Sequence, residues 1–113
     1  TGEGDIMKAL RAGLALGLCL AFAAPVAAQT PPDVQRGRVL VKTYCAQCHS
    51  IDKAGPSPLS IAPPLRDLHR RYPVENLEEA FAEGISTGHP SMPQFQLDPH
   101  EIHDLIAFLK SLE

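Results

Sequence analysis

The 113-residue chain is long enough for one domain, and its formal net charge at pH 7 is -3. A nucleic-acid-binding domain usually presents a basic face, so this acidic balance argues against a nucleic-acid partner. Aromatic residues make up 5% of the chain and Trp is absent. A small core built from such side chains would be marginally stable without a disulfide, a metal or another large buried group.

Residues 7–28 are typical of a secretory signal peptide, with a short basic start, an apolar run and a small-residue cleavage site. The apolar run is shorter than the roughly 20 residues that a membrane-spanning helix needs, which disfavours a retained anchor. We therefore expect residues 1–28 to be an N-terminal extension and signal peptide, with cleavage between Ala28 and Gln29. The mature domain, 29–113, is then expected to be periplasmic and to have no stable membrane span.

A helix is predicted from about Thr30 to Cys48. It opens with a hydroxyl residue, two prolines and an acid, which are favoured at the N-cap, the first position and the first turn. Val34, Val41 and Tyr44 recur at or near helical intervals and are expected to face the core. The last residues of this helix belong to the most informative motif in the chain.

That motif is Cys45-Ala46-Gln47-Cys48-His49, the Cys-x-x-Cys-His pattern that attaches a c-type haem. Two thiols three residues apart lie on one face of a helical turn, so each can bond to one vinyl group of the same porphyrin. His49 can then bind the iron through its imidazole as the proximal ligand. A Cys pair at this spacing also occurs in zinc sites and in redox-active dithiols. However, the chain has no second Cys pair, and no βαβ pattern precedes Cys45.

The next segments alternate irregular and helical patterns. Residues 50–64 contain five Pro or Gly residues and no periodicity, which predicts a loop that could cover one edge of a haem. A short helical turn is expected over 65–72. A helix is expected over 73–83 and should end at Gly84. The inward face of this helix is expected to carry Val74, Leu77 and Phe81, and the outward face Glu75, Glu78 and Glu79.

A second irregular stretch covers 86–97. The residues over 98–101 then predict the start of a helix, with an acidic cap, Pro at the first position and Glu at the third. The apolar side of the helix that follows is formed by Ile102, Leu105, Ile106, Leu109 and Leu112, with Phe108 beside them. No segment shows a convincing period-two strand pattern. The sequence therefore predicts an all-α fold with about three main helices and two long loops that face one covalently attached haem.

Met92 is the predicted distal ligand of the iron. It is the one methionine of the predicted mature domain, and Pro93 stiffens the backbone beside it. A methionine ligand raises the reduction potential relative to two imidazoles. In the alternatives, Met92 fills a gap in the core or His89 binds the iron instead. The remaining histidines are expected at the surface: His69, His100 and His103.

Taken together, these motifs resemble those of the class I c-type cytochromes, small electron carriers with one haem, and the resemblance covers essentially all of 29–113. It depends on four features in order: Gly37, the attachment motif over 45–49, the Ala-Pro-Pro-Leu segment over 62–65, and Met92-Pro93. The resemblance implies a cytochrome c-like fold, one haem c held through two thioethers, and His49 and Met92 as axial ligands.

The resemblance also implies roles for individual residues. Pro63, with Pro64 as an alternative, is expected to accept a hydrogen bond from the proximal imidazole, and Leu65 to contact the cofactor. Gly37 is expected to allow a close helix crossing against Phe108. Two positions depart from the family pattern: Val41 stands where an aromatic residue is common, and Ala62 stands where glycine is common.

The predicted function is one-electron transfer between redox partner proteins, without catalysis. Three alternatives stay open: a haem subunit of a periplasmic dehydrogenase or oxidase complex, a sensor or peroxidase-like haem protein with a labile distal ligand, and a zinc-binding module. The cluster over 66–71 could balance a haem propionate. A basic rim for docking could be formed by Lys42, Lys53, Arg66, Arg70 and Arg71, although each of these residues taken singly is interpreted as an ordinary solvated charge.

Overall fold

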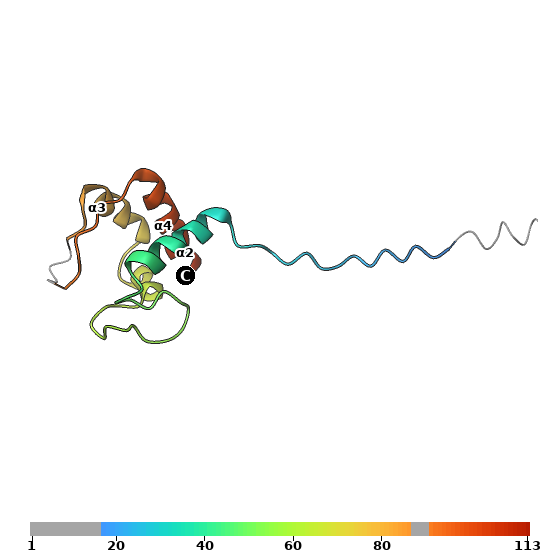
Figure 1. Ribbon diagram of the computed structural model, residues 1–113, viewed down its shortest axis with the longest axis horizontal. Helices are drawn as coiled ribbons and strands as arrows, with labels where there is room; N and C mark the ends of the chain where they lie inside the picture. Colours follow the sequence, from blue (N-terminus) through green and yellow to red (C-terminus); the bar gives the residue numbers. More distant parts are fainter. Residues whose placement is uncertain (1–16, 87–90) are drawn as a thin grey trace, which may run out of the picture.

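The computed structural model describes residues 17–86 and 91–113, and within these ranges every regular element is helical. The elements are α2 (Pro32–Tyr44), the short 3-10 helices η1 (Leu65–Arg70) and η2 (Val74–Asn76), α3 (Leu77–Glu83) and α4 (Pro99–Ser111). Figure 1 shows the helices packed into one body, from which the N-terminal segment extends. The predicted all-α fold with three main helices is confirmed.

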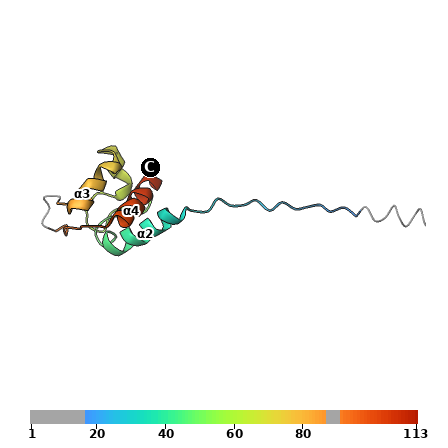
Figure 2. The same cartoon turned by 90° about the horizontal axis from the view of Figure 1, so that it is seen from above.

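Residues 17–31 have no regular secondary structure and lead away from the helical body in both views (Figures 1 and 2). In the described ranges, no helix is both long enough and apolar enough to cross a membrane.

The crossing of α2 and α4 forms the centre of the fold. Gly37 is buried there, and a Cβ atom added to it would lie 2.0 Å from the Asp104 carbonyl oxygen and 2.7 Å from the Phe108 Cβ. The two backbones therefore approach closely only because residue 37 has no side chain. The predicted contact of Gly37 with Phe108 is confirmed. Beside it, Val41 is fully buried against the apolar face of α4.

α4 begins and packs as its sequence predicts. The Asp98 side chain accepts a hydrogen bond from the Glu101 backbone, and the Glu101 side chain accepts one from the Asp98 backbone, which completes a capping box. Ile102, Leu105, Ile106, Phe108 and Leu109 are all buried.

α2 differs from its prediction at both ends. Pro31, not Thr30, occupies the N-cap, and no side chain caps the helix there. At the other end the helix stops at Tyr44 instead of Cys48, because the amides of Cys45 and Ala46 both donate to the Val41 carbonyl and widen the last turn. Tyr44, predicted to face inward, is 50% exposed.

The predicted helix over 73–83 is divided into η2 and α3. Its inward and outward residues were correctly predicted: Val74 and Phe81 are buried, Leu77 is half-buried, and the three glutamates are exposed. Gly84 ends α3 with a φ of +99°, a conformation that strongly favours glycine.

An ion pair also joins α2 to α4. The Arg36 guanidinium donates to both carboxylate oxygens of Asp104, at 2.9 and 3.0 Å. Asp104 is 9% exposed, whereas the Arg36 side chain is 62% exposed. The hydrogen bond from Arg36 lowers the pKa of the Asp104 carboxyl below its ordinary value of 3.8. The stabilisation from this pair is therefore present above that pH and is lost as the pH falls through the lowered pKa.

We expect Asp104→Asn to lower the free energy of unfolding at pH 7, and the deficit should shrink as the pH falls below about 4, where the wild-type carboxylate also loses its charge. Urea denaturation across this pH range measures the deficit. Asp52→Asn is the matched control, because Asp52 pairs with Arg38 at 2.9 Å but both side chains are at least half exposed. The control should change stability little at any pH, and a deficit of Asp104→Asn that stayed constant with pH would contradict the assignment.

Candidate haem site

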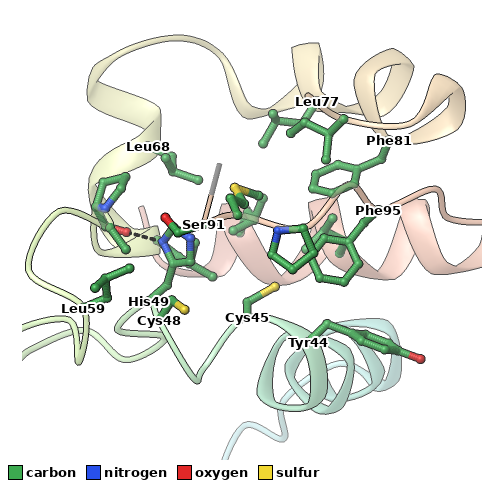
Figure 3. Close-up of a pocket in the computed structure, with 18 of the residues that line it drawn as sticks. Tyr44, Cys45, Cys48, His49, Leu59, Leu68, Leu77, Phe81, Ser91 and Phe95 are labelled. Atoms are coloured by element: carbon green, nitrogen blue, oxygen red, sulfur yellow. Dashed lines mark hydrogen bonds between the residues drawn. The ribbon is translucent and has the colours of Figure 1, made fainter. Parts of the chain in front are cut away.

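One apolar cavity of about 390 Å³ lies between the end of α2, the 50–64 loop, η1, α3, α4 and residues 91–97, here called the distal segment. This volume is within the range of cofactor pockets, roughly 300–1,000 Å³. Figure 3 shows Cys45, His49, Leu77 and Phe81 around a common space, while the Tyr44 ring lies at its edge and points outward. Its walls are mainly aliphatic and aromatic: Leu59, Leu68, Leu77, Phe81, Phe95 and Leu105.

All six predicted site residues line this cavity, and they come from three separate segments. Cys45, Cys48 and His49 follow α2, Pro63 and Leu65 lie at the end of the 50–64 loop, and the distal segment adds the sixth, Met92. The fold therefore brings all six residues to one place from positions up to 47 apart in the sequence.

The His49 ring is oriented by the 50–64 loop. Its Nδ1 lies 2.7 Å from the Pro63 carbonyl oxygen, which only accepts hydrogen bonds, so Nδ1 carries the proton (Figure 3). The neutral imidazole then has its lone pair on Nε2, the nitrogen that is free to bind a metal.

Buried Ser50, the residue after His49, fixes this arrangement. Its carbonyl accepts from the Leu65 amide at 2.9 Å, its amide donates to Ser57 Oγ at 3.0 Å, and its hydroxyl accepts from Arg66 at 3.1 Å. Both ends of the 50–64 loop are thus tied together beside the His49 ring. Sequence reasoning did not identify Ser50, because its partners lie in a loop without periodicity.

The two motif cysteines lie in a helical turn that continues from α2. The amides of Cys48 and His49 both donate to the Cys45 carbonyl, at 3.2 and 2.9 Å. Burial raises the pKa of the Cys45 thiol to about 11. These apolar surroundings favour a neutral sulfur, such as a thioether, over the thiolate that zinc binding or dithiol chemistry requires. In the part of the chain that the structure describes, no three His, Cys, Asp or Glu side chains are grouped to hold a metal ion.

The distal segment carries Met92 along another wall of the cavity, where its side chain is half-buried. Phe95 anchors this segment: its ring lies 5.8 Å from the Tyr44 ring, between centroids, with a tilted orientation. His89, the predicted competitor of Met92, lies outside the described residues. Sequence reasoning missed Phe95, although apolar and polar residues alternate over 94–97 and could have indicated an inward side chain.

The arginines of the predicted basic cluster over 66–71 have different surroundings in the structure. Arg66 is committed to Ser50 and to the Asp52 carbonyl, and Arg70 lies 3.4 Å from the Asp67 carboxylate. Arg71 is exposed and lines the cavity. Arg71 is therefore the residue of the cluster placed to balance a negative group at the cavity mouth.

These residues fit a haem. Two sulfurs and one oriented imidazole lie on one side of an apolar cavity, and a thioether lines it from a separate segment. Such a set can form two thioether bonds and supply two neutral axial ligands, while the walls shield a large apolar ring from water.

Comparison with known proteins agrees with this chemistry. The family profile described as Cytochrome c matches residues 34–113. A cytochrome c-553-like protein of Synechocystis sp. is 34% identical over 80 residues, which cover 71% of this chain and 70% of the relative. Cytochrome c-552 of Bradyrhizobium diazoefficiens is 30% identical over 98 residues, which cover 85% of this chain and 92% of the relative. No solved structure matches the chain. The chain thus belongs to the cytochrome c family.

Proposed function

We propose that the protein is a periplasmic one-electron carrier with one haem c, attached through Cys45 and Cys48 and ligated by His49 and Met92. The observation that carries this proposal is the His49 ring, which is held by the Pro63 carbonyl in a cavity shared with both cysteines and Met92. Membership of the cytochrome c family supports the electron-carrier role.

When bound, the haem supplies an iron that gains and loses one electron. The hydrogen bond from His49 to Pro63 fixes the imidazole orientation and increases its donor strength. The Met92 thioether is a neutral, soft donor that favours the reduced iron and so raises the reduction potential. Retention of both ligands would keep the rearrangement on electron transfer small, and the apolar walls would exclude water from the bound group.

The surface at the cavity mouth suits brief contact with a redox partner. Tyr44 and Ile61 line the cavity and remain 50% and 68% exposed. A small apolar surface of this kind supports the short-lived complexes that electron transfer requires. A stable complex with a dehydrogenase or oxidase is the second candidate, and the native size of the exported protein separates it from a free carrier.

We expect covalent pigment that survives denaturing acid-acetone extraction and is lost from the Cys45→Ser/Cys48→Ser variant, because only these two thiols line the cavity. Mass spectrometry of the exported protein should give residues 29–113 plus one haem. Cys19→Ser is the matched control and should retain all pigment, since Cys19 is exposed and lies in the predicted signal peptide. Extraction of all pigment from the wild-type protein would disprove covalent attachment.

A further inference from the structure

Residues 94–97 run antiparallel to the C-terminal end of α3 and are joined to it by backbone hydrogen bonds. The Leu97 amide donates to the Phe81 carbonyl at 3.0 Å, and the Ile85 amide donates to the Phe95 carbonyl at 3.0 Å. Phe95 and Leu97 pack against the core from this segment. The distal segment is therefore attached to α3 directly after Met92-Pro93.

Two glutamine side chains extend this attachment. Gln96 Nε2 donates to the Ala82 carbonyl at 3.1 Å, and Gln94 Nε2 donates to the Gly84 carbonyl at 3.4 Å. The last carbonyls of a helix have no partner within the helix, and helix α3 ends at Glu83. These two amides thus satisfy carbonyl groups at the end of α3 that would otherwise bond to water.

Both glutamines are exposed, so neither contributes to the apolar core. Their side chains lie on the outer side of the segment, whereas Phe95 between them lines the cavity. Gly84 brings the chain close to Gln94, because a Cβ atom at Gly84 would lie 3.1 Å from Gln94 Nε2. The contact between the two segments is therefore built from hydrogen bonds on the outside and from the apolar side chains of Phe95 and Leu97 on the inside.

We propose that Gln96, and to a smaller extent Gln94, are positioning residues that hold the distal segment on α3 and so set how readily the Met92 sulfur leaves the cavity. This inference rests on the proposed ligation by Met92. Met92 is only two residues from Gln94 and four from Gln96, so separation of this part of the segment from α3 would carry the Met92 backbone, and with it the sulfur, away from the cavity. Loss of the Gln96 donor removes one of the hydrogen bonds that oppose this separation.

The test uses the oxidised holoprotein and added imidazole, which can bind the iron only after the Met92 sulfur has left. Gln96→Met keeps the length of the side chain and removes its donor. It should speed imidazole binding about three- to tenfold, the range expected for one lost hydrogen bond. Gln94→Met should have a smaller effect because its contact is longer. Gln96→Lys restores a donor to the helix end and should return the rate to near the wild-type value.

Hydrogen exchange of backbone amides provides a second readout that does not depend on ligand binding. In Gln96→Met the Leu97 and Ile85 amides should exchange faster than in the wild-type protein, because both amides bond across the contact that opens. Gln35→Met is the matched control, because Gln35 makes a similar exposed bond to the Thr30 carbonyl far from the cavity. It should alter neither measurement.

An unchanged imidazole rate in Gln96→Met would overturn the positioning role, whether or not the amides exchange faster. A faster rate that Gln96→Lys fails to restore would also overturn it. The oxidised wild-type protein is examined first for the weak long-wavelength band of iron–sulfur coordination. Absence of that band would refute ligation by Met92 itself, whereas its presence with an unchanged rate would refute only the role of the glutamines.

Discussion

Replacing Met92 with alanine is expected to lower the reduction potential of the holoprotein by about 100 mV or more, within the roughly 0.8 V that axial ligands span in haem proteins. The thioether favours the reduced iron, and water or a nitrogen ligand in its place favours the oxidised iron. Alanine at position 92 cannot reach across the cavity that Met92 lines. A redox titration measures the change, and the long-wavelength band of the oxidised protein should disappear.

Ile61→Ala is the matched control for this variant. Ile61 lines the same cavity, is 68% exposed and has no atom that could bind iron, so its removal should change the potential by much less and leave the band intact. If the wild-type protein lacked the band and Met92→Ala kept the wild-type potential, Met92 would not be the ligand. A large effect of His89→Ala in the same titration would then identify His89 in its place.

The elements that could be predicted from the sequence are those whose signals are local. α4 begins at a capping box formed by residues three apart, and its inward residues recur at helical spacing, so both its start and its buried face were correctly predicted. The spacing of Cys45, Cys48 and His49 likewise placed three site residues on one turn, and the structure places them in one cavity.

Features that depend on distant contacts were not predictable in the same way. α2 ends early because two amides share the Val41 carbonyl, and nothing in the residues before Cys45 signals this. Arg66 and Arg71 look equivalent in the sequence, yet Arg66 bonds to Ser50 while Arg71 lines the cavity. The course of the distal segment follows from its bonds to α3, which join residues 10 to 16 positions apart.

Gly37→Ala is expected to lower the free energy of unfolding of the holoprotein by about 2 kcal/mol or more, because the clash is with backbone and lies at the upper end of overpacking costs. Alanine in a helix normally stabilises by about 1 kcal/mol relative to glycine. Here the new Cβ would lie 2.0 Å from the Asp104 backbone oxygen, so α2 and α4 must separate, and the cost of such overpacking is typically 1–3 kcal/mol or more. Because the obstacle is backbone and not a flexible side chain, local adjustment cannot relieve it.

Urea denaturation of the holoprotein measures this loss, and Val39→Ala is the matched control. Val39 lies on the same helix and is 65% exposed, so this change gives a similar gain in helix propensity without a clash and should alter stability by less than about 1 kcal/mol. The loss should also reach the site, because Leu105 and Leu109 of α4 line the cavity and move with the helix. We therefore expect Gly37→Ala to bind added imidazole faster than Val39→Ala does. If both variants were equally stable, the close crossing of α2 and α4 would be wrong, and with it the placement of one wall of the haem site.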